Sequence, residues 1–167
     1  MTQTQEETLE LAKLAFEEGQ KGLCDQDQTI SSIRQRSIWI GGLAGVIASF
    51  LGREALKVAP LSKVTCSIES AALVIGFVAL CAVYIAIFYI VRPRGNLCFH
   101  NSPSSIISQF IEGEHATNLV TTYKELARFS EENYKNNEET ISVLFKWLLF
   151  AALSMFVEFV AWIIVLA

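Results

Sequence analysis

Apolar residues form three uninterrupted stretches along the chain, and the most hydrophobic end of the sequence is its C-terminus. Residues 147–167 contain one charged residue, Glu158. A helix of this length spans about 31 Å, which matches the hydrocarbon thickness of a bilayer. The pattern therefore predicts a transmembrane helix over 147–167.

The position of Glu158 inside that stretch predicts which helix face turns inward. An acidic side chain at mid-membrane costs roughly 2.5–3.5 kcal/mol, so it should face protein or water. At helical spacing Glu158 shares a stripe with the small residues Ala151, Ser154 and Ala161. The opposite stripe is bulky and carries Leu149, Leu153, Phe156, Val160 and Ile163.

Two roles fit this stripe. In the first, Ser154, Glu158 and Ala161 line or gate a pore, and sister subunits shield or hydrate the acid. In the second, a protonated carboxyl hydrogen-bonds a neighbouring helix and only holds the bundle together. Both remain open at the level of the sequence.

The other two apolar stretches, Ser37–Gly52 and Ser70–Val91, carry no charge and predict two further spans. The first of them repeats small residues at four-residue spacing, which allows helix backbones to approach closely. The ridge predicted to pack against a neighbouring helix consists of Gly41, Gly45 and Ser49. Between the two spans, residues 53–69 are expected to form a loop, with Pro60 as the helix breaker.

Two polar regions alternate with the spans. Residues 1–36 predict an amphipathic helix that Arg34 and Arg36 close at the membrane, and from about His115 a long helix is expected to run into the last span. The seam of the first helix is Leu9, Ala12, Phe16, Gly19, Leu23, Gln26, Ile30 and Ile33. The buried stripe expected in the second is Leu119, Tyr123, Leu126, Phe129 and Tyr134.

These elements predict an all-α membrane protein with three transmembrane helices and a small cytoplasmic helical domain. The expected segments are a cytoplasmic helix over 1–36, two spans over 37–91, a cytoplasmic loop and long helix over 92–146, and the third span over 147–167. Basic residues next to the spans favour a cytoplasmic N-terminus by the positive-inside rule. Those residues are Arg34, Arg36, Arg92, Arg94 and Lys146.

Composition narrows the range of functions that the protein could have. Apolar residues make up 52% of the chain and the net charge is −4, which argues against nucleic-acid binding driven by bulk charge. The four cysteines are widely spaced and read as free thiols, and two histidines cannot build a recognisable metal site. No phosphate-binding glycine loop, nucleophile elbow or zinc-protease motif occurs, so we expect neither an enzyme nor a bound cofactor.

Arginines at the membrane edge form the one cluster with the chemistry of a ligand site. Guanidinium groups bind phosphate, while amides and aromatic rings suit bases and sugars. The residues predicted to bind a nucleotide are Arg34, Arg36, Arg92, Arg94, Asn96, Phe99 and His100. The alternative is that these arginines only anchor the helices to anionic lipid.

The segment Asn96–Ser105, directly after a span that ends in Arg-Pro-Arg, is similar to the membrane domain of Pycsar-type effectors. The similarity extends over the short apolar run Ile106–Phe110, the polar helix before the last span and the opening DQTISSIRQRSIWIGGL. Related small membrane effectors occur in CBASS-type and Hailong defence systems. The resemblance implies an antiphage effector in the bacterial inner membrane that senses a nucleotide or short oligonucleotide made by a partner nucleotidyltransferase or cyclase.

The resulting hypothesis is a homo-oligomeric channel, because three spans cannot enclose an aqueous path alone. Several copies would surround the pore as a tetramer or similar ring in contact with membrane lipid. The bound nucleotide would determine whether water reaches the Glu158 stripe. The rival is a non-conducting membrane adaptor or regulatory subunit whose cytoplasmic helices dock a protein partner. The 9–33 seam fits both.

Overall fold

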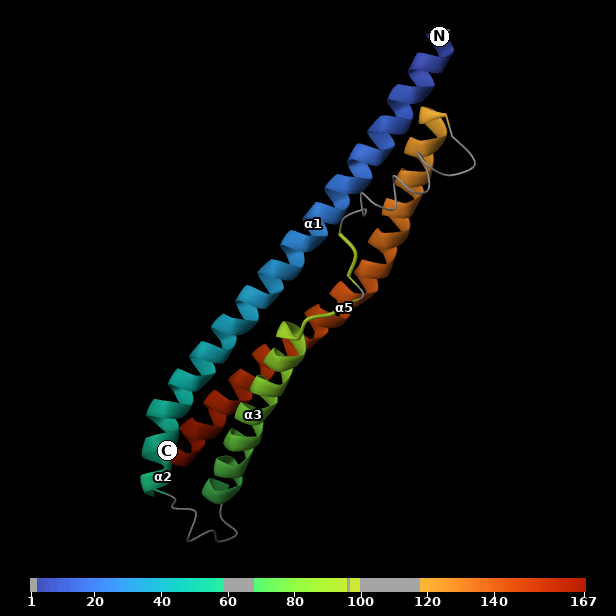
Figure 1. The fold of residues 1–167 in the computed structure, drawn as a ribbon. Helices are drawn as coiled ribbons and strands as arrows, with labels where there is room; N and C mark the ends of the chain where they lie inside the picture. The colour runs from blue at the N-terminus through green and yellow to red at the C-terminus, as the bar shows by residue number, and fades with distance from the viewer. Residues whose placement is uncertain (1–2, 59–67, 96, 100–117) are drawn as a thin grey trace. The chain divides into compact units, whose positions relative to one another are not determined.

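The computed structural model describes residues 3–58, 68–95, 97–99 and 118–167, and every regular element in them is helical. The elements are α1 (Gln3–Ile47), the π-helical η1 (Ala48–Gly52), α2 (Arg53–Val58), α3 (Ile68–Val91) and α5 (Leu119–Leu166) (Figure 1). Three helical segments are long and apolar enough to cross a membrane. The prediction of an all-α membrane protein with three such helices is confirmed.

The first helix is longer than its hydrophobic pattern predicts. Arg34 and Arg36 do not close it, because α1 continues without interruption from Gln3 to Ile47. Charged side chains end an apolar run but do not break a helix, and neither proline nor glycine occurs between Gly22 and Gly41.

The loop predicted over 53–69 is also wrong at its start, where α2 occupies Arg53–Val58. These residues are mostly strong helix formers, and Lys57 donates a hydrogen bond of 2.6 Å to Glu54 one turn earlier. The π-helical turn Ala48–Gly52 joins α1 to α2 without ending the helical path. Pro60, the predicted breaker, lies outside the described residues.

The chain divides into two compact units. Unit 1 consists of Met1–Ile30 and Arg94–Ser142, and unit 2 consists of Ser31–Pro93 and Val143–Ala167. Both α1 and α5 contribute their ends to different units, because each helix continues across a unit boundary. The short apolar run Ile106–Phe110 lies outside the described residues.

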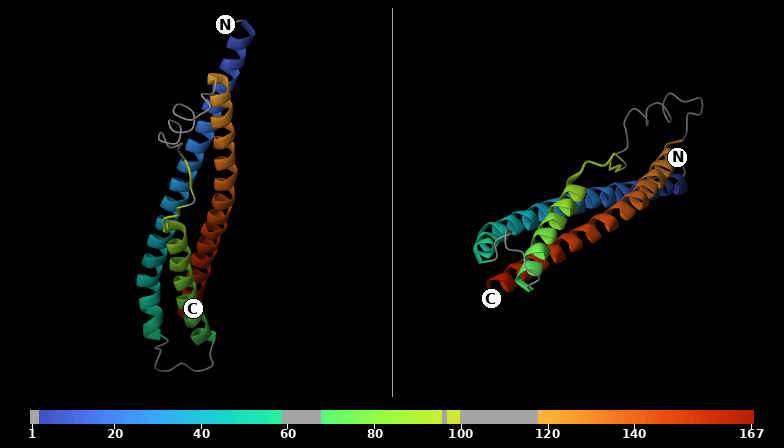
Figure 2. Two further views of the ribbon diagram at one scale, coloured as in Figure 1. Left: turned by 45° about the vertical axis from the view of Figure 1, so that its right-hand side comes forward. Right: turned by 90° about the horizontal axis from the view of Figure 1, so that it is seen from below.

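Unit 2 is a bundle of three helical segments. In it α3 runs opposite in direction to α1 and α5 and lies beside the C-terminal part of α5 (Figures 1 and 2). Its core cluster joins α2, α3 and α5, and partly buried side chains from α1, η1 and α2 pack against it. The buried members are Ala55, Ala72, Leu73, Trp162 and Val165.

Unit 1 pairs the N-terminal part of α1 with the first part of α5. The predicted seam of α1 is confirmed, since Ala12, Leu23, Gln26 and Ile30 are buried. Phe16 meets an aromatic partner of α5, Tyr123, with ring centroids 5.8 Å apart.

The stripe predicted for α5 in unit 1 is only partly right. Leu126 is buried, but Leu119, Phe129 and Tyr134 are exposed to between two fifths and three fifths. The buried face instead carries polar side chains at the same helical spacing, Ser130, Asn133 and Asn137. A search for apolar residues alone selects the wrong face, because a helix pair can bury small amides and hydroxyls that bond each other.

Candidate functional site

Glu158 is completely buried inside unit 2. Its Oε1 accepts a hydrogen bond of 3.2 Å from Nε1 of Trp162, one turn further along α5. Its Oε2 is buried and has no hydrogen-bond partner in the part of the chain that the structure describes. The carboxyl is therefore half-satisfied, and a buried polar atom without a partner costs about 1–3 kcal/mol.

The indole that bonds Glu158 is the largest fully buried side chain of the protein's described residues. Trp162 lies against two glycines of other elements, Gly52 of η1 and Gly76 of α3, where no side chain occupies the space that the ring fills. A Cβ placed on Gly76 would lie 3.1 Å from two ring atoms of Trp162. Phe77 meets the same indole edge-on, with centroids 5.2 Å apart. The ring is thus enclosed by all three helical segments.

One face of the last span is buried and the opposite face is exposed, as the sequence predicts. The small residues Ala151, Ser154 and Ala161 are buried together with Glu158. The bulky residues Leu149, Leu153, Phe156, Val160 and Ile163 are exposed. One expectation needs correction: sister subunits are not required to shield the acid, because a single chain encloses it. The glycine pair that admits Trp162, Gly52 and Gly76, is recognised only from the packed helices and gives no signal in the sequence.

The small-residue ridge of α1 contacts α3 through its first two members. The hydroxyl of Tyr84 donates a hydrogen bond of 3.3 Å to the backbone oxygen of Gly41. A Cβ on Gly45 would lie 2.9 Å from the same hydroxyl oxygen, and one on Gly41 would lie 2.5 Å from Cδ1 of Ile87. Ser49 is exposed and donates its hydroxyl to the backbone oxygen of Gly45 in its own helix, at 2.7 Å.

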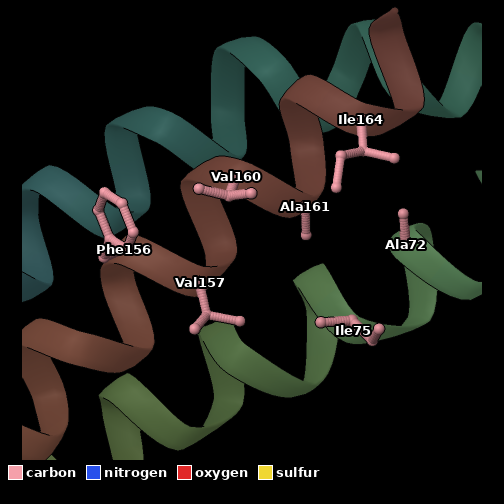
Figure 3. A pocket seen from close by; sticks show the side chains of 7 residues that line it. All are labelled: Ala72, Ile75, Phe156, Val157, Val160, Ala161 and Ile164. Atoms are coloured by element: carbon pink, nitrogen blue, oxygen red, sulfur yellow. The ribbon is translucent and has the colours of Figure 1, made fainter.

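An apolar groove of about 190 Å³ lies between α3 and α5 (Figure 3). Val157, Val160, Ala161 and Ile164 reach it from α5, and Ala72 and Ile75 from α3. All of its lining side chains are aliphatic or aromatic. Such side chains offer no polar ligands to an ion.

Unit 1 contains a polar seam between α1 and α5. Gln20 donates a hydrogen bond of 3.0 Å to the hydroxyl of Ser130, and Gln26 donates one of 2.9 Å to the backbone oxygen of Tyr134. Oε1 of Gln26 and Nδ2 of Asn133 are buried without a partner among the described residues. The seam is only partly satisfied, which makes its packing less stable than that of an apolar seam.

Asn137 is a structural residue that the sequence did not single out. It is 1% exposed, and its side-chain amide pairs with both backbone groups of Cys98. Nδ2 donates to the oxygen of Cys98 at 3.0 Å, while the backbone nitrogen of Cys98 donates to Oδ1 at 3.3 Å. This pairing fixes the segment Leu97–Phe99 against α5. One asparagine in a run of polar residues gives no sequence signal for such a long-range contact.

The residues predicted to bind a nucleotide fall in different units. Arg34, Arg36 and Arg92 belong to unit 2, whereas Arg94 and Phe99 belong to unit 1. Arg34 is half-buried, and its Nε has no hydrogen-bond partner within the described part. Arg36 and Arg92 are exposed, and Phe99 is half-buried. Asn96 and His100 lie outside the described residues.

Comparisons of the chain with protein-family models, with curated proteins and with solved structures found no match.

Proposed function

We propose that copies of this protein assemble into an ion channel in a membrane and that Glu158 is the acid whose hydration accompanies opening. The observation that carries the proposal is the buried, half-satisfied carboxyl in the middle of an apolar bundle. An ionisable residue at membrane depth is rare because of its cost, and it commonly marks an ion or proton path.

The energetics of that carboxyl favour a protein with two packings. In the described packing Glu158 loses the stabilisation of one hydrogen bond, about 1–3 kcal/mol, because Oε2 has no partner among the described residues. A second packing in which water or another chain bonds Oε2 regains it. Two states separated by a few kcal/mol are what a ligand can interconvert, provided that it binds them with different affinity.

The long helix α5 offers a mechanical route for such a switch. Its first half belongs to unit 1 and its second half carries Glu158, so a shift of α5 in unit 1 displaces the gating residues along one continuous rod. The partly satisfied polar seam of unit 1 favours this, since a seam of exchangeable hydrogen bonds can adopt a second register. In this proposal unit 1 is the small cytoplasmic domain, and the N-terminus lies in the cytoplasm.

The signal proposed to drive the shift is a nucleotide or short oligonucleotide bound by the segment that follows α3. That segment contains Arg92, Arg94, Asn96, Phe99 and His100, and Asn137 anchors its middle to α5. A ligand on this segment would therefore act directly on the switching helix. The resemblance to antiphage effectors supplies the setting: a bacterial inner-membrane effector that depolarises the cell when a partner enzyme makes the nucleotide.

Ion flux from vesicles tests the channel. Purified protein in potassium-loaded liposomes should release potassium, alone or on addition of one member of a panel of cyclic mono-, di- and trinucleotides. Glu158→Gln, which still accepts from Trp162, should alter the flux, whereas Glu69→Gln, an exposed acid at the start of α3, should leave it unchanged. Absence of flux from wild type under every condition would contradict the channel and favour the adaptor.

A second comparison tests the signal segment. The double variant Arg92→Ala, Arg94→Ala should lose the nucleotide response while it assembles as wild type does. Arg128→Ala serves as the matched control, because Arg128 is an exposed arginine of α5 that pairs with Glu125 in its own helix. A normal response of the double variant would show that the nucleotide binds elsewhere.

A further inference from the structure

A second groove in unit 2 has a different character from the one in Figure 3. It lies between α1 and α5, has a volume of about 470 Å³ and carries one cation, Arg36. The rest of its lining is aliphatic or aromatic and includes Trp39 and Ile40 of α1 with Phe145, Leu148 and Ala152 of α5. Arg36 stands one helical turn before Trp39, so the two residues share one face of α1, and both line the groove.

The charged residues at this groove are positive. Within the described residues Arg36 takes part in no ion pair. Lys146, the residue after Phe145, is a second exposed cation. No Asp or Glu occurs in residues 31–53, 70–93 or 143–157, which form most of unit 2. The groove therefore joins a long apolar wall to an uncompensated positive charge.

We propose that this groove binds one anionic phospholipid, with an acyl chain along the apolar wall and the headgroup phosphate on Arg36. A guanidinium binds phosphate oxygens through two parallel hydrogen bonds. A tryptophan next to it is the residue type that prefers the level of the headgroups. The cytoplasmic leaflet, where the proposed topology puts Arg36, is the leaflet whose anionic lipids attract such basic residues.

The other occupants fit the same residues less well. A nucleotide needs amides, hydroxyls or carbonyls for its base and sugar, and the lining of this groove provides an aliphatic and aromatic wall beside one arginine. A second copy of the chain would bring its own Arg36 and Lys146, and like charges repel. An amphipathic ligand with one negative end and a long apolar body matches both parts of the groove.

Native mass spectrometry of the full chain in detergent tests the proposal. With equal amounts of palmitoyl-oleoyl phosphatidylglycerol and phosphatidylcholine, wild type should retain mainly phosphatidylglycerol. Arg36→Ala should lower that retention about tenfold, the loss expected for a charge-assisted contact. Arg53→Ala, which removes an exposed arginine outside the groove, should retain the lipid. Glycerol 3-phosphate, the headgroup without chains, should not compete.

A variant that fills the groove distinguishes a lipid bound inside it from lipid that is attracted by positive charge alone. Ala152→Phe should reduce phosphatidylglycerol retention, whereas Leu153→Phe, at the next and exposed position, should not. Equal losses in Arg36→Ala and Arg53→Ala, or normal retention by Ala152→Phe, would each overturn the proposal.

Discussion

The two units of the chain bury opposite kinds of side chain with the same two helices. Unit 1 encloses amides and a hydroxyl, Gln26, Ser130, Asn133 and Asn137, among a few aliphatic residues. Unit 2 encloses an indole, aliphatic side chains and small residues, with Glu158 as its one buried acid among the described residues.

The difference follows from the solvents that the proposed topology assigns. In water, apolar burial drives helices together, so a seam can include imperfectly bonded amides. In lipid that driving force is absent between helices, and close contact through small residues replaces it. We infer that unit 2 is rigid around Trp162 in the described packing and that unit 1 is the more adjustable. Variants of both units test this contrast, beginning with the largest expected effect.

Removal of the Trp162 ring should have the largest effect. Trp162→Ala would empty a fully enclosed site and leave Oε1 of Glu158 without its donor, so the free energy of unfolding should fall by about 3–5 kcal/mol. Unfolding in mixed SDS and detergent micelles measures it. Trp39→Ala, at an exposed tryptophan of α1, should change stability by less than about 0.5 kcal/mol. Similar losses in both variants would contradict a rigid centre at Trp162.

The two glycines beside Trp162 offer a finer comparison. Cβ atoms added at Gly76 would lie 3.1–3.2 Å from the ring, against 3.5–3.7 Å at Gly52. Since the enclosed ring cannot retreat, Gly76→Ala should be less stable than Gly52→Ala by about 1–3 kcal/mol. Both variants gain helix propensity when glycine becomes alanine, so this gain largely cancels when their stabilities are compared. Equal stabilities in the same unfolding assay would mean that the core around Trp162 is loose.

In unit 1 the strongest expected effect is local. Asn137→Ala removes both hydrogen bonds to Cys98, and because Cys98 is exposed, water replaces part of them. We expect a loss of about 1 kcal/mol and faster hydrogen exchange of the Cys98 amide. Asn136→Ala, at the exposed neighbouring position, is the control. Unchanged exchange at Cys98 in the Asn137 variant would show that the segment 97–99 is held in another way.

The smallest effect is expected at an exposed ion pair of the same unit. Lys135 donates to Glu131 at 2.7 Å, yet both side chains are about two thirds exposed. Solvent screens such pairs, so Lys135→Ala should leave the unfolding curve unchanged within error. Ser130→Ala, which leaves Gln20 without its acceptor in a part-buried position, should have the larger effect. The reverse order would mean that surface charge, not the polar seam, holds unit 1.

Hydropathy and helical periodicity predict where helices occur better than they predict where each helix ends. The stretch 70–91 lies within α3, and all of 147–167 except Ala167 lies within α5. The Glu158 stripe and most of the Leu9–Ile33 seam are buried, while Leu9, Phe16 and Gly19 are half-buried. At Arg36 and Gly52 an apolar run begins or ends, but the helical path continues through both residues. Hydropathy reports whether a segment prefers water or an apolar environment. The ends of a helix depend instead on the helix propensity of its residues and on helix-breaking residues such as proline and glycine.

The contacts that define the candidate site could not be predicted in this way. That Trp162 fits between Gly52 and Gly76, and that Asn137 pairs with Cys98, depends on which helices meet and in which register. The buried polar stripe of α5 was missed because Ser130, Asn133 and Asn137 carry no apolar signal. Phe129 and Tyr134, which do carry one, are exposed.

The most direct test of the central claim is the reversal potential of single channels in planar bilayers under a potassium chloride gradient. If Glu158 becomes hydrated in a pore formed by several chains, wild type should prefer potassium over chloride. Glu158→Gln should then lose most of that preference, since the amide keeps the hydrogen bond to Trp162 but carries no charge. Identical reversal potentials for the two proteins, or no current from wild type, would contradict the claim that Glu158 lines the open path.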